Sequence, residues 1–228
     1  MALGRSLGLV QSGQTATVEV VAFYDGWYLN DGLHNSSNTN NFTGINSPAY
    51  LNSFSAFGLS TLSGANVLSA KISFIGDGLY ESDGAAETLG LFDVKTLITD
   101  LVAGGSGLVG TFNDLGSGVS YGRYVYTATN GSPTAPFSVA LNAFALADIH
   151  TVLAGSDTRF AIGATLLSLG SNPTSEEALW FASDNSSSGA AGLTLETGVA
   201  PVPLPTSSFL LVASLLGLGA VARRVRPT

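Results

Sequence analysis

The sequence contains no cysteine and few charged residues. Without cysteine, disulfide bonds, Cys-ligated zinc sites, iron–sulfur clusters and thiol nucleophiles are excluded. Charged residues make up 11% of the 228 residues, against about 25% in ordinary globular domains. Glycine (28 residues), serine, threonine and asparagine take their place, while 45% of residues are hydrophobic and suffice for a core. This composition is typical of exported β-proteins.

The charges that are present divide sharply along the chain. All 16 acidic residues precede position 200, whereas Arg223, Arg224 and Arg226 supply three of the eight basic residues. The segment 1–199 therefore holds five basic and 16 acidic residues, a formal charge of −11. An acidic body repels phosphate backbones, so we expect no nucleic-acid partner.

The segment 16–197 is predicted to be an all-β domain. Apolar residues alternate with polar ones at 67–74, where Leu68, Ala70, Ile72 and Phe74 share one face of the expected strand. Gly, Asn, Asp and Ser cluster between similar segments, as turns require. The pattern predicts an antiparallel β-sandwich, jelly-roll-like. Further strands are expected at 17–24, 51–59, 88–93, 123–127, 137–141, 160–167, 179–182 and 193–196.

Two short helices are expected within this domain, at 95–102 and 142–154. Asn142 is suited to cap the second helix, because its side chain can accept a hydrogen bond from the first turn. Leu146, Ile149, Val152 and Leu153 would form the apolar face of that helix.

The C-terminal tail carries the most specific pattern of the sequence. A proline motif, Val202, Pro203, Leu204 and Pro205, precedes an uncharged segment, 206–222, which ends at Arg223. As a helix rising about 1.5 Å per residue, its 17 residues would span roughly 25 Å, close to the ~30 Å hydrocarbon core of a bilayer. Arginines resist translocation and stay cytoplasmic, so the body would lie outside.

A packed helix of a soluble domain is the alternative for this tail. Such a helix should show a polar face, but only Ser214 interrupts the apolar run from 209 to 222. We therefore predict a linker with the proline motif at 198–208, a transmembrane helix at 209–222 and a basic cytoplasmic tail at 223–228.

Proline motif, short apolar helix and terminal arginines together resemble the PEP-CTERM sorting signal of Gram-negative bacteria, in its VPLP variant. The resemblance covers 202–228. It implies that an exosortase recognises Val202, Pro203, Leu204 and Pro205 while Arg223, Arg224 and Arg226 stop transfer through the inner membrane. Leu204 replaces the glutamate of the commonest form. The implied destination, after a transient stay in the inner membrane, is the cell surface or extracellular matrix, with exopolysaccharide as a partner.

The body also resembles the adhesin-like exported domains that carry this signal. The matching phrases lie at 26–28, 32–35, 53–60, 114–118 and 121–122. This resemblance implies a β-sandwich and no catalytic residue.

The segment 1–15 matches a secretory signal poorly. It holds one arginine, Arg5, and an apolar stretch only at 7–10, whereas a signal peptide needs about 7–15 apolar residues. We therefore expect the true start of the protein to lie upstream.

Other motifs bear on cofactor and metal binding. Gly105 opens a GxGxxG pattern that a helix-like segment precedes and β-like residues follow, whereas a dinucleotide site needs a strand before it and a helix after it; we predict a loop. His34 and His150 are interpreted as surface residues without metal-ligand spacing. Asp-Gly pairs at 25, 31, 77 and 83 are expected turns that could also supply oxygen ligands to structural Ca²⁺. No other cofactor is predicted.

Aromatic residues offer a second route to function. Trp27 and Tyr28 lie among Gly, Asp and Asn in a turn-like region, which makes them candidate glycan contacts. The remaining rings considered for such a platform are Tyr50, Tyr80, Tyr121, Tyr124, Tyr126 and Trp180.

Three functional interpretations follow. The first is an exported structural or adhesive surface protein without enzymatic activity. The second is a carbohydrate-binding module of the same fold. The third is a secreted glycan-active enzyme, which needs two facing carboxyl groups about 5–10 Å apart. The candidate carboxyl groups are Glu81, Asp83, Glu87, Glu176 and Glu177.

Overall fold

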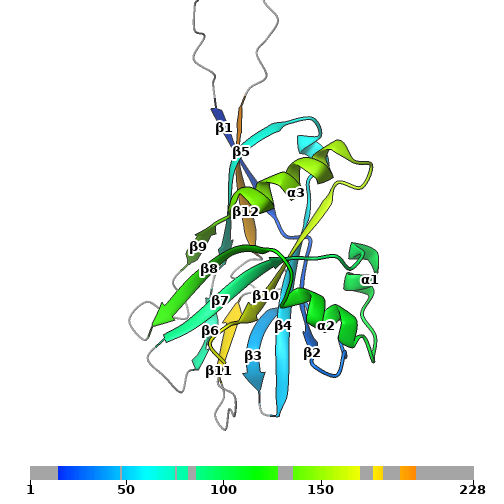
Figure 1. Cartoon of the computed structure of the whole chain (residues 1–228), viewed down its shortest axis with the longest axis vertical. Coiled ribbons are helices and arrows are strands. Elements are labelled where there is room, and N and C mark those ends of the chain that lie inside the picture. Colours follow the sequence, from blue (N-terminus) through cyan, green and yellow to red (C-terminus); the bar gives the residue numbers. More distant parts are fainter. Residues whose placement is uncertain are drawn as a thin grey trace, which may run out of the picture. The chain divides into compact units, whose positions relative to one another are not determined.

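A computed structural model describes residues 15–46, 48–74, 76–81, 86–127, 136–169, 177–181 and 191–198. These residues belong to one compact unit, Gln14–Gly198, shown in Figure 1. The segments 1–14 and 199–228 lie outside the described residues, and with them the proline motif, the predicted transmembrane helix and the terminal arginines. No helix in the described ranges is long and apolar enough to cross a bilayer.

The described chain is mostly β, with antiparallel pairing and three short α-helices. The strands are β1 (Thr15–Val21), β2 (Tyr24–Leu29), β3 (Asn41–Asn46), β4 (Ala49–Gly58), β5 (Asn66–Phe74), β6 (Gly76–Glu81), β7 (Ala86–Asp93), β8 (Ser120–Thr127), β9 (Phe137–Ala140), β10 (Arg159–Leu166), β11 (Glu177–Phe181) and β12 (Gly192–Gly198). The helices are α1 (Ile98–Ala103), α2 (Val109–Leu115) and α3 (Ala143–Ala154), with a 3₁₀ turn, η1, at Ser60–Leu62.

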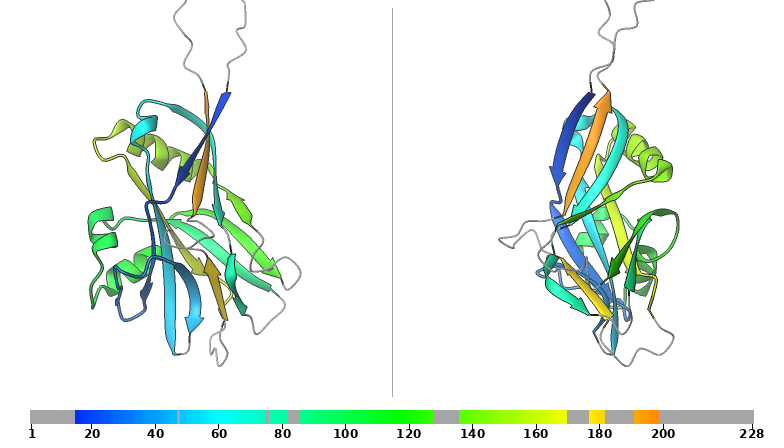
Figure 2. Two further views of the ribbon diagram at one scale, coloured as in Figure 1. Left: turned by 180° about the vertical axis from the view of Figure 1, so that it is seen from behind. Right: turned by 90° about the vertical axis from the view of Figure 1, so that its left-hand side faces the viewer.

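The strands form two sheets, which Figure 2 shows from two further sides. The smaller sheet has the order β1-β12-β5-β9. The larger sheet runs β6-β11-β3-β4-β10-β7-β8, and β2 pairs with β4 beside this path. Thr15 in the first strand pairs with Gly198 in the last, so the two ends of the described unit leave side by side.

The main core lies between these sheets and α3. It gathers buried apolar side chains from both sheets, including Phe57, Ile72, Leu89 and Leu193, and Ile149 from α3. Asn142 caps α3 as predicted, because its side chain accepts hydrogen bonds from the backbone N–H groups of Phe144 and Ala145. The helix thus begins where the sequence indicates and buries its apolar side against the sheets.

The strand β4 is buried on both faces, from Leu51 to Phe57. Phe57 points into the main core, whereas Phe54 and Ala56 belong to a second core that also contains Leu101 of α1 and Leu115 of α2. Helices α1 and α2 therefore cover the outer face of this sheet, as Figure 1 shows. A two-sided burial of this kind explains the continuous apolar and small residues of the segment.

Every strand predicted from the sequence overlaps an observed one, but three strands were missed. These are β2, β3 and β6. The predicted face of β5 is also partly wrong, because the ladder with β12 shifts register between the pairs at Val67 and Ser69 and leaves Leu68 48% exposed. A bulge of this kind moves a side chain to the other face.

The prediction of two helices is wrong, because α2 is a third one. The residues after the GxGxxG pattern look β-like in the sequence, yet α2 begins at Val109. Its sequence, VGTFNDL, contains glycine and β-branched residues that disfavour helix in isolation. Packing against β4 and β10 overrides that preference. Since α1 and not a strand precedes the pattern, the dinucleotide fingerprint remains unsupported.

The contact between α2 and β10 yields a first prediction. A Cβ added at Gly163 of β10 would lie 2.5 Å from the backbone oxygen of Leu115. Gly163→Ala should therefore lower the free energy of unfolding by about 1–3 kcal/mol through overpacking, measured by urea denaturation. Gly110→Ala in α2, where nothing lies within 4 Å of the added Cβ, is the matched control. It should be neutral or stabilise by up to about 1 kcal/mol; equal losses in both variants would contradict this packing.

Candidate functional site

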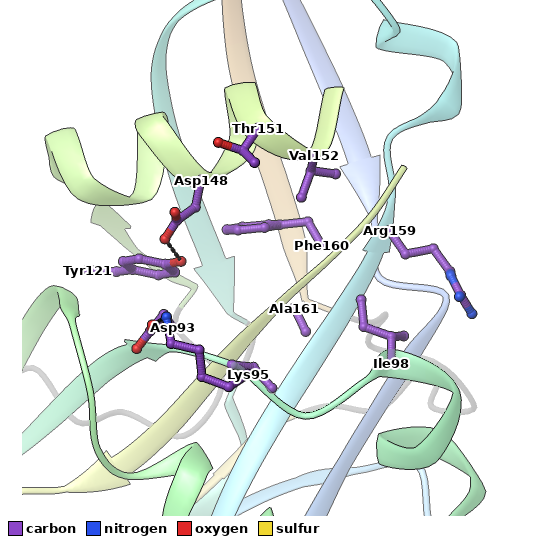
Figure 3. Close-up of a pocket in the computed structure, with 11 residues that line it drawn as sticks. Asp93, Lys95, Ile98, Tyr121, Asp148, Thr151, Val152, Arg159, Phe160 and Ala161 are labelled. Carbon is purple, nitrogen blue, oxygen red and sulfur yellow. Dashed lines mark hydrogen bonds and ion pairs between the residues drawn. The ribbon is translucent and has the colours of Figure 1, made fainter. Parts of the chain in front are cut away.

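A polar pocket opens where β7, β8, β10 and α3 meet, with a volume of about 210 Å³. Figure 3 shows Asp148, Thr151 and Val152 descending from α3 toward Tyr121 and Phe160. Asp93 and Lys95 enter from the end of β7 and the segment that follows it. The pocket thus brings together charged residues that lie far apart in the sequence.

One side of this pocket is held by a hydrogen bond between β8 and α3. The hydroxyl of Tyr121 donates to Oδ2 of Asp148 at 2.6 Å, and the Tyr121 ring stacks on Phe160 with centroids 6.0 Å apart. Burial, followed by the hydrogen bond to Asp148, raises the pKa of the Tyr121 phenol. The phenol therefore stays protonated and acts as a donor that fixes the carboxylate.

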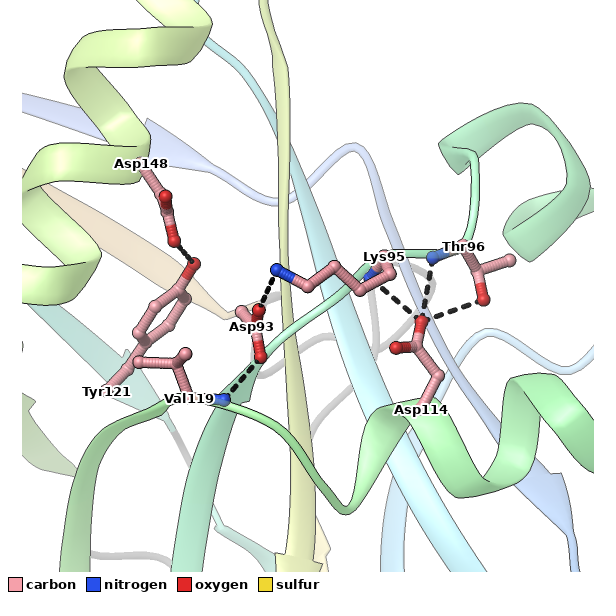
Figure 4. Close-up of polar contacts among 7 residues, drawn as sticks. All are labelled: Asp93, Lys95, Thr96, Asp114, Val119, Tyr121 and Asp148. Carbon is pink, nitrogen blue, oxygen red and sulfur yellow. Dashed lines mark hydrogen bonds and ion pairs between the residues drawn. The ribbon is translucent and has the colours of Figure 1, made fainter.

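The opposite side is organised by Asp93 (Figure 4). Its Oδ1 accepts the backbone N–H of Val119 at 2.7 Å, and its Oδ2 lies 2.5 Å from Nζ of Lys95. Asp114 of α2 accepts three hydrogen bonds from Lys95 and Thr96. These bonds attach the end of β7 to the residue that precedes β8, and the segment after β7 to α2.

The carboxylates that line this pocket are engaged in contacts within the fold. Asp93 is 3% exposed, and both of its oxygens are engaged as described. Arg159, at the pocket edge, points away from the Tyr121–Asp148 pair (Figure 3) and binds Asp157 at 2.7 Å. We therefore assign the charged groups here to holding β7, β8 and α3 together.

Two of the carboxyl groups that the sequence suggested for catalysis, Glu87 and Glu177, have described side chains, and neither lines this pocket. Glu87 accepts a hydrogen bond from the hydroxyl of Ser168, and Glu177 is buried in β11. Asp83, Glu176 and the side chain of Glu81 lie outside the described residues. The pair that does line the pocket, Asp93 and Asp148, could not be recognised from sequence because its members come from distant elements.

A second hollow, which we call the Trp27 groove, lies beside β2, β3 and the start of β4. Its volume is about 280 Å³. Its residues are Trp27, Leu29, Asn38, Asn40, Phe42, Asn46, Ala49 and Leu51. The indole N–H of Trp27 donates to Oδ1 of Asn40 at 3.0 Å, which fixes the ring. The structure thus places one of the two predicted glycan contacts, Trp27, half-buried at a groove.

The other predicted contact, Tyr28, is wrong. Its side chain is 0% exposed, and its hydroxyl donates to the backbone oxygen of Leu101 in α1 at 2.8 Å. Burial, the nearby Tyr24 and Asp100 raise the pKa of Tyr28 to about 12. Trp27 and Tyr28 are successive residues of β2, whose side chains point to opposite faces. Only one of them can line the groove.

The turn predicted at Asp25 and Gly26 is also wrong, because both residues lie in β2. Asp25 is buried and accepts hydrogen bonds from the Asn41 side chain at 2.8 Å and from the backbone N–H of Ala191 at 3.3 Å. A Cβ at Gly26 would lie 2.9 Å from the rings of His34 and Phe54. Close packing, not chain reversal, accounts for this glycine.

The other candidate ligands for calcium are accounted for in part. Asp31 accepts the backbone N–H of Leu33 at 2.9 Å, a local turn contact. Asp83 and the side chain of Asp77 lie outside the described residues. Within the described ranges, no group of three or more His, Asp or Glu side chains could hold a metal ion.

Among the remaining rings of the predicted platform, the four with described side chains do not line the groove. Tyr121 and Tyr126 are buried in the main core, and Tyr124 packs against it. Tyr50 is 36% exposed. The side chains of Tyr80 and Trp180 lie outside the described residues.

His34 is not the surface residue that the sequence suggested, since it is only 3% exposed. Its Nδ1 lies 2.7 Å from the backbone oxygen of Trp27, which can only accept, so Nδ1 carries a proton. Its ring contacts Tyr24, Tyr28 and Phe54. Burial lowers the pKa of His34, partly offset by the bond to the Trp27 backbone. His150, half-buried on α3, lies 2.9 Å from the backbone oxygen of Val67.

Comparison with known proteins adds no relative. The chain matches no protein-family model, and no curated protein matches it. Function must therefore be argued from the sequence motifs and the geometry described above.

The bond between Tyr121 and Asp148 gives a second prediction. Tyr121→Phe should reduce the free energy of unfolding by about 1–2 kcal/mol, because it removes a hydrogen bond to a charged group. Tyr50→Phe, at a partly exposed ring, should change it by less than about 0.5 kcal/mol. A double-mutant cycle with Asp148→Ala, which removes the acceptor, isolates the pairwise term. A coupling free energy near zero would show that the bond contributes nothing.

The burial of His34 gives a third prediction. The folded state disfavours the imidazolium, so below the ordinary pKa of 6.5 the unfolded state takes up a proton that the folded state does not. Stability should therefore fall as pH drops from 7.0 toward 5.5, with a slope of up to about 1.4 kcal/mol per pH unit. Urea denaturation at several pH values measures this slope.

Substitution of His34 assigns that slope to its source. His34→Gln should flatten the dependence of unfolding free energy on pH. An unchanged slope in the His34 variant would mean that another group titrates.

Proposed function

We propose that this chain is an exported structural or adhesive protein of the cell surface or extracellular matrix, delivered through its C-terminal segment. The observation that carries the proposal is the sequence of 202–228: a proline motif, a short apolar run and three arginines in that order. The apolar run would hold the chain in the inner membrane as a transmembrane helix. An exosortase would recognise the motif, cleave the chain near it and release the body to the outside.

The body of the chain fits this proposal in composition and architecture. Its β-sandwich-like fold, with low charge and many hydroxyl and amide side chains, is the kind of domain that works outside cells. The described unit ends at Gly198. Val202, the first residue of the proline motif, follows shortly after it in the predicted linker at 198–208. The jelly-roll-like interpretation of the sandwich remains part of this proposal.

No enzymatic activity is proposed. Polar groups of the pocket bind one another: the Asp93 carboxylate pairs with Lys95, and the neutral phenol of Tyr121 donates to Asp148. The bond between Tyr121 and Asp148 links β8 to α3, and the Asp93–Lys95 pair joins the end of β7 to the segment that follows it. These contacts favour a structural role for the pocket over a reactive one.

The fourth prediction tests delivery. Removal of 202–228 from the protein in its native host should abolish its delivery to the surface and matrix, because both the motif and the membrane segment are lost. Immunoblots of inner-membrane, outer-envelope and medium fractions measure the distribution. Unchanged surface delivery of the truncated chain would contradict the proposal.

Two matched variants separate recognition from anchoring. Replacement of Pro203 and Pro205 by alanine keeps the apolar run, so the chain should stay in the inner membrane unprocessed. Replacement of Arg223, Arg224 and Arg226 by glutamine keeps the motif but removes the transfer stop, so topology should become mixed. If both variants reach the surface like the parent, an exosortase does not read this tail.

A further inference from the structure

The Trp27 groove combines an aromatic wall, an apolar floor and a rim of amides. Trp27 is half-buried, so part of its ring faces the hollow. Phe42 and Leu51 are 5% and 3% exposed and form the floor. Asn38, Asn40 and Asn46 line the same hollow and are half-buried or exposed. Apolar and hydrogen-bonding groups thus face one small volume from β2, β3 and the segment before β3.

The indole of Trp27 is oriented before any ligand arrives. Its N–H donates to Oδ1 of Asn40, and its strand is fixed by pairing with β4, where Trp27 lies opposite Ser53. A ring held in one position offers contact area at low cost in conformational entropy. The amide of Asn40 keeps two N–H donors after its oxygen is engaged.

Charge selects the class of ligand. None of the described residues that line the groove is charged, although the segment 1–199 is acidic overall. An anionic ligand would find no cation here and would meet an unfavourable field. A cationic ligand would find no carboxylate to pair with. A neutral molecule with an apolar face and several hydroxyl groups matches the ring and the amides.

The volume sets the size of that ligand. At about 280 Å³, the groove lies just below the ~300–1,000 Å³ of pockets that hold drug-sized molecules. One sugar ring, with its C–H face on an indole and its hydroxyls toward asparagine, is a group of this size and chemistry.

We infer that the Trp27 groove binds one unit of a neutral polysaccharide, with Trp27 as the stacking platform and Asn38, Asn40 and Asn46 as hydrogen-bonding groups. The inference deepens the proposed function and rests on it for the cellular setting, since it names the partner that a displayed domain would hold. Binding is measured on purified protein and delivery is measured in cells. Failure of one experiment therefore leaves the other interpretable.

The experiment is affinity gel electrophoresis of the full chain in a non-ionic detergent without a sugar headgroup. Gels contain one of four probes: dextran, galactomannan, mixed-linkage β-glucan or alginate. The first three polysaccharides are neutral, and alginate is acidic. We expect the parent protein to be retarded by at least one neutral polysaccharide and to migrate freely through alginate.

Variants then assign the retention to the groove. Trp27→Ala should weaken retention by about tenfold or more, as expected when an aromatic anchor is truncated, while Trp27→Phe should keep most of it. Asn46→Lys, at an exposed rim position, should block the groove without entering the core. Phe144→Ala on α3, where the ring is 64% exposed, is the matched control and should behave as the parent. Thermal unfolding confirms that each variant is folded.

Retention by a neutral polysaccharide that is lost in both Trp27→Ala and Asn46→Lys, and kept in Phe144→Ala, supports the assignment. No retention of the parent on any of the three neutral probes would overturn it. Retention only on alginate, or retention unaffected in folded Asn46→Lys, would overturn it as well.

Discussion

The position of β4 at the centre of the larger sheet constrains everything around it. This strand pairs with β2, β3 and β10 and is buried on both faces, so each face needs its own cover. The smaller sheet and α3 form the main core on one side, while α1 and α2 close the other. Pairing with β4 also fixes the orientation of β2. Tyr28 therefore lies beneath α1, and Trp27 lines the groove on the other face.

Sequence patterns predict those helices and strands that are determined by residues close together in the chain. The cap at Asn142 and the apolar spacing of α3 are local, and so is the alternation in β5. The strand β2 could not be predicted, because Asp25 and Gly26 look like a turn. Asp25 is instead satisfied by Asn41, and Gly26 admits the rings of His34 and Phe54. Such contacts depend on the assembled fold.

The same distinction applies to the candidate sites. Trp27 could be predicted as a glycan contact because it is an aromatic residue among polar ones. That Tyr28 is buried could not be predicted, because this follows from both residues lying in one strand, with their side chains on opposite faces. The polar pocket could not be predicted from the sequence, because Asp93, Tyr121 and Asp148 come together only when β7, β8 and α3 pack against one another. The two hollows also differ in their lining. The polar pocket is lined by ion-paired side chains and a phenol, whereas the described residues of the Trp27 groove are uncharged and include three amides. That contrast separates a structural junction from a surface suited to a neutral ligand.

We propose above that a folded β-domain is delivered and released through its C-terminal segment. Mass spectrometry of the native protein from inner-membrane, envelope and medium fractions tests this most directly, because it reads the C-terminus itself. We expect a form outside the cell that ends near Pro205 and lacks the apolar run and arginines. A chain ending at Thr228 and confined to the inner membrane would contradict processing by an exosortase and leave a simple membrane-anchored protein.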